Sequence, residues 1–340
     1  GRKVYDQLSN RPATTEDEDA MSRAAIEVVH VGSASRDLTA DDPRGWRLGG
    51  GVTYAALTTA RLGLRTAAYI GVDAAAASAH ELGLLRAAGV ELQLSPLAEG
   101  PVFDNQETPD GRIQICHAVG RPLAVPELPA VWAAAAAWSL VPVAGEVGEA
   151  WVAAVPDHAY LALGWQGMLR DLVAGGRVVR RPPGASGLVR RADLVGVSHH
   201  DVEGGTSLAM LASFLHPGAD LLVTEGREGG LLVRVDEDGQ GETLRYLPTA
   251  TDGELDPTGA GDTFLAALLT SVVRPRVAGP GRSRRSPDLR FAAAAGSLVV
   301  EGPGLAGVPD RTAVLIRRAR ERVRRAVLPS EASQVGWVER

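Results

Sequence analysis

The order of strand-like and helix-like segments constrains this fold more than any other feature. A β-branched run at residues 26–32, IEVVHVG, ends in glycine and predicts a buried strand. A helical run at 52–62 and a second strand at 66–70 follow it. Repeated strand-then-helix order predicts an α/β fold: a doubly wound, mostly parallel sheet with helices on both faces. The other expected elements are a helix at 76–88, strands at 90–94, 160–163, 194–197 and 221–224, and a last helix at 311–327.

Two segments interrupt this alternation and predict a small β-rich lid. They comprise residues 38–50 and 100–118, and in the second a Pro-Asp-Gly turn lies between two β-prone runs. We expect the lid to project from the edge of the sheet and to cover the substrate. The domain plan is then a flexible leader at 1–25, one α/β domain at 26–328 and a C-terminal tail at 329–340. A Pro, Gly, Ser and Arg-rich segment at 274–290 predicts a surface loop.

Charge and composition exclude several classes of protein. The 340 residues carry a formal net charge of −6, which argues against a general nucleic-acid or anionic-membrane binder. The most apolar stretch, 131–143, is too short to span a bilayer, and the acidic leader lacks the pattern of a secretory signal. With Cys116 as its one cysteine, the chain forms no internal disulfide, which fits a cytoplasmic location.

The scarcity of lysine excludes further classes. Lys3 is the only lysine, so the GK[ST] phosphate loop, the protein-kinase strand lysine and a lysine Schiff base are all ruled out. HExxH and GxSxG are missing too, and no GxGxxG follows the first strand, which argues against a dinucleotide-binding dehydrogenase.

The segment DPTGAGDTF at 256–264 carries the strongest chemical signal. Two glycines at the start of an apolar helix let backbone N–H groups converge on an anion, where the helix dipole also favours negative charge. A carboxylate beside that cradle would repel phosphate unless it has a task. In phosphoryl transfer, Asp262 would accept the proton of the attacking hydroxyl. The alternative is that Asp262 is only a favourable charge at a helix N-terminus.

This segment resembles the C-terminal signature of the ribokinase-like PfkB carbohydrate kinases. The resemblance extends over about residues 26–310. After the first strand, VVHVGSASRDL puts Asp37 at the family's substrate-binding aspartate, and Gly49-Gly50-Gly51 matches its glycine turn. It implies a ribokinase-like fold in which Asp262 is the catalytic base and the N–H groups of Gly259, Ala260 and Gly261 form an anion hole.

Two later segments resemble the nucleotide-binding part of the family. They are VTEGREG at 223–229, which could equally connect a β-hairpin, and FAAAAGS at 291–297, which could equally be a helix packed through alanines. The resemblance implies ATP as the phosphoryl donor. The residues expected to bind it are Thr224, Gly226, Gly229, Thr258 and Ser297.

The chain departs from the family pattern at two places. Tyr54 stands where relatives commonly carry an asparagine that bonds a sugar hydroxyl. The family's Asn-x-x-Glu appears as Ser198-His199-His200-Asp201, in which Asp201 could hold Mg²⁺ through water. The adjacent histidines lack a third placed ligand and are more typical of a surface. Some relatives also need a monovalent cation, which could bind near Asp256.

Other residues resemble a divergent branch that includes inositol kinases. They are Tyr54, the segments 103–105 and 166–170, and the altered Asn-x-x-Glu. Asn105, Arg112 and Gln166 would contact the hydroxyls of a polyol ring, although Arg112 could instead pair with Asp110. The full expected substrate set is Asp37, Gly49, Gly50, Tyr54, Asn105, Arg112 and Gln166.

The expected function is ATP-dependent phosphorylation of a sugar or cyclitol hydroxyl with Mg²⁺, by a protein that forms a homodimer through its lid and has no nucleic-acid or membrane partner. Two alternatives stay open. The first is a nucleoside kinase in which Tyr54 or Trp46 stacks on a base. The second is a catalytically silent sugar- or nucleotide-binding regulator that kept the fold.

Overall fold

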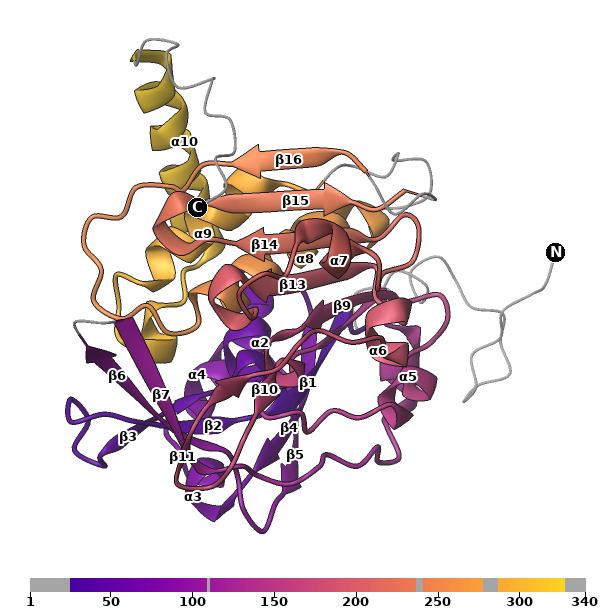
Figure 1. The fold of residues 1–340 in the computed structure, drawn as a ribbon, viewed down its shortest axis with the longest axis vertical. Helices are drawn as coiled ribbons and strands as arrows, with labels where there is room; N and C mark the ends of the chain where they lie inside the picture. Colours follow the sequence, from indigo (N-terminus) through magenta and orange to yellow (C-terminus); the bar gives the residue numbers. More distant parts are fainter. Residues whose placement is uncertain (1–24, 109–110, 237–240, 278–286, 328–340) are drawn as a thin grey trace, which may run out of the picture.

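A nine-stranded sheet forms the centre of the protein, with the order β16-β15-β14-β13-β9-β8-β1-β4-β5 (Figure 1). The computed structural model describes residues 25–108, 111–236, 241–277 and 287–327. Neighbouring strands from β14 to β5 run parallel, and β15 and β16 add an antiparallel edge. The mostly parallel sheet is therefore confirmed. The strands are β1 (Val28–Ser33), β4 (Thr66–Val72), β5 (Glu91–Pro96), β8 (Ala137–Leu140), β9 (Tyr160–Gly164), β13 (Leu194–Ser198), β14 (Asp220–Thr224), β15 (Gly230–Arg234) and β16 (Thr243–Tyr246).

The chain starts in the middle of this sheet and then builds both sides. From β1 it goes outward to β4 and β5, and it returns to place β8, β9, β13 and β14 on the other side of β1. The strand order therefore reverses between β1 and β8. In open parallel sheets, ligands bind beyond the carboxyl ends of the strands at such a reversal.

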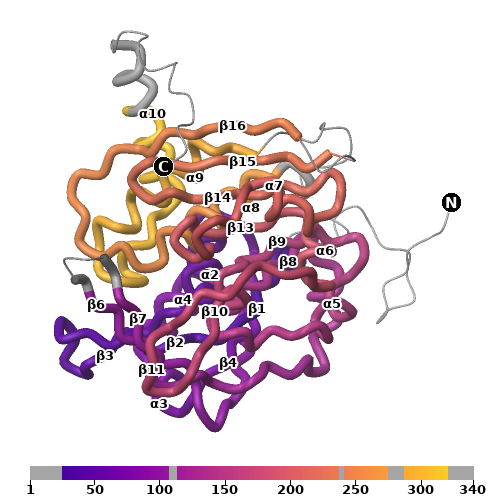
Figure 2. Tube along the Cα trace, in the orientation of Figure 1, coloured from indigo at the N-terminus to yellow at the C-terminus, as the bar shows by residue number. Residues whose placement is uncertain are grey.

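Helices cover both faces of the sheet, as predicted. On one face α2 packs against α8, although they come from opposite ends of the chain, and α9 packs against α8 (Figure 2). The helices are α2 (Gly51–Arg61), α3 (Ala74–Ala77), α4 (Leu82–Ala87), α5 (Ala150–Ala154), α6 (Gly187–Arg191), α7 (Leu208–Ala212), α8 (Ala260–Val277), α9 (Leu289–Val299) and α10 (Arg311–Val327). Single 3₁₀ turns are η1 (Ala130–Ala134), η2 (Gln166–Met168), η3 (His199–Asp201), η4 (Gly226–Glu228) and η5 (Gly304–Gly307).

Each face of the sheet has its own hydrophobic core, because successive side chains of a strand point to opposite faces. In β1, Val28 packs into the cluster formed with α2, α8 and α9. Its neighbour Val29 packs into a second cluster on the opposite face, which includes residues of α5, α6 and α7. Four buried tryptophans fill this second core, namely Trp132, Trp138, Trp151 and Trp165.

A separate five-stranded sheet with the order β11-β7-β6-β2-β3 confirms the expected β-rich appendage (Figure 1). The strands β2 and β6 pair in parallel, and the other pairs are antiparallel. We call this small sheet the lid. Its strands are β2 (Ser35–Leu38), β3 (Trp46–Gly49), β6 (Val102–Thr108), β7 (Gly111–Ala118) and β11 (Gly176–Arg177). The short pair β10 (Arg170–Asp171) and β12 (Val179–Arg180) lies between β9 and β13 in the chain.

The structure corrects several local predictions. The expected helix at 76–88 is two short helices, α3 and α4, and α3 begins where the Asp73 carboxylate accepts the N–H of Ala76. The alanine-rich stretch 131–143 contains β8, a central strand that its composition does not suggest. The expected loop at 274–290 begins as helix, because α8 continues to Val277. Residues 278–286, the leader and the tail lie outside the described residues, so the expected domain boundaries stay predictions.

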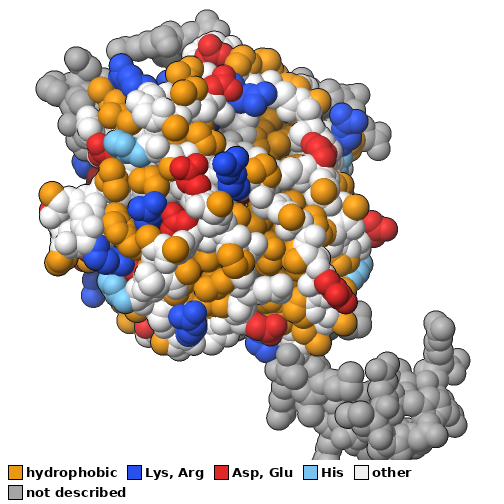
Figure 3. All heavy atoms as spheres, turned by 90° about the horizontal axis from the view of Figure 1, so that it is seen from below, with side chains coloured by type: hydrophobic (Ala, Val, Ile, Leu, Met, Phe, Trp, Pro, Cys, Tyr) orange, Lys and Arg blue, Asp and Glu red, His pale blue; other side chains and the backbone are white. Residues whose placement is uncertain are grey.

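One face of the protein carries charges of both signs scattered among hydrophobic side chains (Figure 3). Over the part of the chain that the structure describes, no helix is both long and apolar enough to cross a bilayer.

Candidate active site

The predicted catalytic and substrate residues gather beyond the carboxyl ends of the parallel strands. Asp37 follows β1, Gln166 follows β9, Asp201 follows β13 and Thr224 ends β14. Because these strands are neighbours or near neighbours in the sheet, their ends share one edge. Asp262 comes to the same edge from the first turn of α8, which packs against β9 and β13. The tertiary structure thus assembles residues that are more than 200 positions apart.

The start of α8 has the backbone geometry that the predicted anion cradle needs. Gly259 has a φ of 77°, a left-handed conformation that favours glycine, and the Tyr54 ring occupies the place where its side chain would be. The Ala260 N–H donates to the Pro257 carbonyl at 3.3 Å. Among the described residues, the N–H groups of Gly261 and of Asp262 have no protein partner. Two unpaired N–H groups at the start of an 18-residue helix suit a phosphate oxygen.

The carboxyl of Asp262 has an environment that suits a general base. Burial and the neighbouring Asp201 carboxylate raise the pKa of Asp262 to about 6, with a smaller contribution from Asp37, while the positive charge of Arg170 opposes the rise. A base with a pKa near working pH is largely ionised at neutral pH and still binds a proton well. Perturbed carboxyls of this kind concentrate at functional sites.

The glycine turn at 49–51 holds two of these carboxylates close to backbone. A Cβ at Gly49 would collide with the Asp37 carboxylate, and a Cβ at Gly51 would lie 2.8 Å from Asp262 Oδ1. Gly50 has a φ of 98°, which favours glycine. The Asp37 carboxylate also accepts a hydrogen bond of 2.9 Å from the Ser35 hydroxyl. The turn therefore fixes Asp37 and Asp262 against the N-terminus of α2.

Tyr54 differs from the expected role of a substrate contact. Its side chain is 2% exposed and packs beneath Gly259, and burial raises its pKa well above the usual range. Trp46 is the second aromatic residue considered for base stacking. In the pairing of β2 with β3, Asp37 lies opposite Arg47, and the next pair is Leu38 with Trp46. Trp46 therefore lies on the lid face opposite to Asp37, where the guanidinium of Arg44 stacks 4.4 Å from its ring.

Asp256 ties the cradle to the lid. Its Oδ1 accepts the N–H of Thr258 at 2.9 Å, and its Oδ2 accepts the N–H of Gly304 at 3.0 Å. Arg47 of β3 donates to the same Oδ2 at 3.4 Å. The carboxylate at the expected monovalent-cation position thus already has a protein cation beside it.

Asp201 lies in a polar cluster with two residues from the end of β9. Gln166 Nε2 donates to its carboxylate at 3.0 Å and 3.2 Å, and Arg170 Nη2 donates at 3.2 Å. No group of three or more His, Cys, Asp or Glu side chains suited to a metal occurs in the described ranges. A single carboxylate with these partners fits Mg²⁺ that is held by donor phosphates and water, with Asp201 binding one of the waters.

The lid brings one more pair of amide side chains toward this cluster. Asn105 of β6 and Gln114 of β7 are paired, and Gln114 Nε2 donates to Asn105 Oδ1 at 2.8 Å. They share a lid face with Phe103, whose ring lies 6.0 Å from the Arg170 guanidinium carbon. Arg112 lies on the same strand pair, opposite Glu107, but its side chain is outside the described part.

Four of the residues expected to bind the nucleotide lie in two separate places, the β14–β15 connection and helix α9. Thr224, Gly226 and Gly229 lie at the β14–β15 connection, which is indeed a hairpin connection between antiparallel strands. Ser297 lies in α9, where its hydroxyl donates to the Ala294 carbonyl and accepts from Arg317. Its role as an ATP contact stays a prediction.

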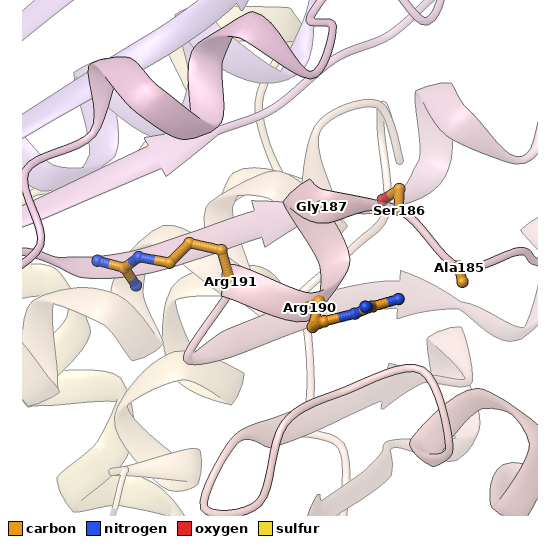
Figure 4. A pocket seen from close by; sticks show the side chains of 5 residues that line it. All are labelled: Ala185, Ser186, Gly187, Arg190 and Arg191. Carbon is orange, nitrogen blue, oxygen red and sulfur yellow. The ribbon is translucent and has the colours of Figure 1, made fainter.

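A separate depression of about 540 Å³ is lined by Ala185, Ser186, Gly187, Arg190 and Arg191 (Figure 4). These residues lie just before β13, at the amino edge of the sheet, whereas Asp201 follows β13. Arg190 and Arg191 extend in opposite directions there. Arg191 is held by three backbone carbonyls and by Asp193. The depression is distinct from the site around Asp262.

Solved structures with the same fold define the structural class. The chain is similar to a pyrophosphate-dependent kinase in the ribokinase family, solved with a pyrophosphate analog and myo-inositol, at 21% identity and a TM-score of 0.65 over 85% of this chain and 99% of that chain. It is also similar to the Methanocaldococcus jannaschii nucleoside kinase, at 15% identity and a TM-score of 0.60 over 87% of this chain and 99% of that chain. A third similar structure is Arabidopsis thaliana ribokinase, solved with ribose and ATP. It has 19% identity and a TM-score of 0.56 over 86% of this chain and 99% of that chain.

Sequence comparison agrees with this class over part of the chain. Residues 191–311, which contain DPTGAGDTF, match the pfkB family carbohydrate kinase. No curated protein matches the chain. The resemblance to PfkB kinases is therefore confirmed, by sequence over residues 191–311 and by the ribokinase fold over most of the described chain. The branch that includes an inositol-binding kinase is among the structural relatives.

Proposed function

We propose that this protein is a kinase that transfers a phosphoryl group to a hydroxyl of a sugar or cyclitol, with Asp262 as the general base. One observation carries the proposal. Asp262, whose pKa is raised to about 6, lies in the first turn of α8, where its own N–H and that of Gly261 have no partner among the described residues. A base and an anion site at one helix terminus can serve proton removal and phosphoryl transfer together.

The proposed reaction uses residues on both sides of the glycine turn. Asp37 and the lid amides orient the acceptor, and Asp262 takes the hydroxyl proton as the new oxygen–phosphorus bond forms. The N–H groups at the start of α8 stabilise charge on the transferred group. Mg²⁺, when bound, would neutralise the donor phosphates, with Asp201 and Gln166 on its water shell. Closure of the lid would exclude water, which otherwise competes as acceptor.

ATP is the proposed donor, and the Arabidopsis relative solved with ATP supports it. The pyrophosphate-dependent relative makes pyrophosphate the donor to compare directly. A cyclitol or sugar acceptor is favoured over a nucleoside, because Tyr54 is buried beneath Gly259 and Trp46 lies on the opposite face of the lid. Neither aromatic ring is placed to stack on a base next to Asp37.

The test is phosphoryl transfer by purified protein with Mg²⁺, using ATP and pyrophosphate as donors and cyclitols, sugars and nucleosides as acceptors. We expect acceptor-dependent transfer that falls by about 10²–10⁴-fold in Asp262→Asn. Donor binding without transfer to any acceptor would contradict the proposal and support a silent binding protein. A nucleoside as the best acceptor would retain the kinase and overturn the acceptor class.

Location and assembly are further proposals. The one cysteine, Cys116, is free and buried in the lid, which is compatible with a reducing cytoplasm. A homodimer formed through the lid stays a prediction, and sedimentation of the full chain would test it.

A further inference from the structure

Arg170 is a cation within the acidic centre of the site that the proposed reaction has not yet used. Its side chain is 9% exposed, and it forms an ion pair of 3.2 Å with Asp201. Its guanidinium carbon lies 6.0 Å from the Phe103 ring of the lid. Arg170 therefore lies at the junction of the lid with the main sheet, and lid strand β6 contributes one wall around it.

The carboxylates of the site favour a protein cation near the reacting atoms, in addition to the proposed Mg²⁺. Three carboxylates, from Asp37, Asp201 and Asp262, act on one another there. A phosphoryl donor brings additional negative charge, and the transition state spreads that charge over the oxygens of the transferred group. Lys3, the only lysine, lies outside the described residues, so arginine is the remaining permanent cation type.

The hydrogen bonds of Arg170 leave donors for a ligand. A guanidinium has five N–H donors in a planar fork that suits phosphate oxygens. In the part of the chain that the structure describes, its one side-chain hydrogen bond is to Asp201 Oδ1. The planar group can thus hold Asp201 on one side and present N–H groups to an anion on another.

A second, independent observation ties Arg170 to the base. Among the influences on the Asp262 carboxyl, burial, Asp201 and Asp37 raise its pKa, while the positive charge of Arg170 lowers it. Arg170 is thus in contact with Asp201, one of the two carboxylates that raise the pKa of Asp262.

We infer that Arg170 is a further catalytic residue of the proposed kinase, which binds the phosphoryl group in transfer. The inference rests on the proposed function. In the step, the bond between phosphorus and the acceptor oxygen forms and the bond to the donor's bridging oxygen breaks. The acceptor proton goes to Asp262, and Arg170 exchanges no atom. Its guanidinium stabilises the oxygens of the transferred group, as arginines do in other phosphoryl transfers.

The test compares Arg170→Gln and Arg170→Lys with the wild type in the phosphoryl-transfer assay. We expect kcat to fall by about 10²–10³-fold in Arg170→Gln, as when one preorganised charge donor is removed. The acid limb of the kcat profile should move to higher pH, because Asp201 and Asp37 then act on Asp262 without the opposing cation. Added guanidinium ion should restore part of the rate in Arg170→Gln.

Arg234→Gln is the matched control, because it also removes an arginine from a buried aspartate. Arg234 donates two hydrogen bonds of 2.8 Å to Asp220, at the amino end of β14. We expect this control to lower the melting temperature with no change in the pH profile and no guanidinium rescue. Unchanged kcat and pH profile in Arg170→Gln would overturn the inference while wild-type transfer upholds the kinase. A rise in acceptor KM with unchanged kcat would also overturn it and assign Arg170 to the acceptor.

A binding measurement keeps the inference testable if no acceptor is found. Calorimetry with magnesium-ATP and with inorganic pyrophosphate, on wild type and Arg170→Gln, measures the contact directly. We expect the donor that the wild type binds more tightly, magnesium-ATP or pyrophosphate, to bind at least tenfold more weakly to the variant. Equal donor affinity would overturn the role of Arg170. No phosphoryl transfer by the wild type would instead contradict the proposed function.

Discussion

Replacing Asp262 with asparagine should abolish transfer and also stabilise the folded protein at neutral pH. Burial and Asp201 raise the pKa of Asp262 from 3.8 to about 6. The folded state therefore binds this proton more tightly than the unfolded chain does. Stability is then lost as the pH rises from about 4 to about 6, and a neutral side chain of the same shape avoids this loss.

The size of this effect follows from the pKa shift. About two pH units correspond to about 3 kcal/mol, at 1.36 kcal/mol per unit. Asp262→Asn should therefore be up to about 3 kcal/mol more stable than the wild type at pH 7.5. The difference should shrink toward zero below about pH 4, as the carboxyl becomes protonated in the unfolded chain as well as in the folded protein.

Urea unfolding of the two proteins at pH 4.5, 6 and 7.5, combined with the transfer assay, checks both parts. A stability gain that grows with pH, together with lost transfer, is the expected result. It would identify Asp262 as a residue kept for its chemistry at the expense of stability. A gain that does not depend on pH, or a loss of stability at pH 7.5, would refute the electrostatic reasoning.

Three further perturbations follow from the contacts. Gly51→Ala places a Cβ 2.8 Å from Asp262 Oδ1, so we expect about a 10²-fold fall in transfer, in the assay above, with circular dichroism unchanged. Arg317→Gln leaves Glu301 without its guanidinium partner. Burial alone would raise the pKa of Glu301, but the hydrogen bond from Arg317 contributes to lowering it. The free energy of unfolding of the variant, measured with urea, should therefore fall by about 1–3 kcal/mol at pH 7 and by less at pH 4. Burial lowers the pKa of His30 to about 3, so thermal stability should fall between pH 6.5 and pH 4, and a His30→Gln variant should show a shallower fall. Equal pH slopes for wild type and His30→Gln would contradict the last expectation.

Local sequence was sufficient where one segment carries both the signal and the structure. Short apolar runs predicted β1, β4, β9, β13 and β14, because a buried parallel strand needs little beyond its own composition. Local sequence failed at β8, because four residues that follow an alanine run give no β-pattern, although pairing with β1 and β9 places this strand in the centre of the sheet. Local sequence also failed to separate α3 (Ala74–Ala77) from α4 (Leu82–Ala87).

In the candidate site, too, local sequence predicted some features and tertiary structure decided the others. DPTGAGDTF alone predicted an anion cradle with a carboxylate, because glycine conformation and helix N-termini are local properties. Tertiary structure alone decided that Tyr54 lies beneath Gly259, that Gly51 lies against Asp262, and that Arg170 joins Asp201. The pKa of Asp262 depends on burial and on the charges of Asp37, Arg170 and Asp201, which come from the segments after β1, β9 and β13 and meet only when the sheet forms. Sequence therefore determined the type of chemistry, and the folded chain decided which residues act on it, since electrostatic interactions depend on distance in space.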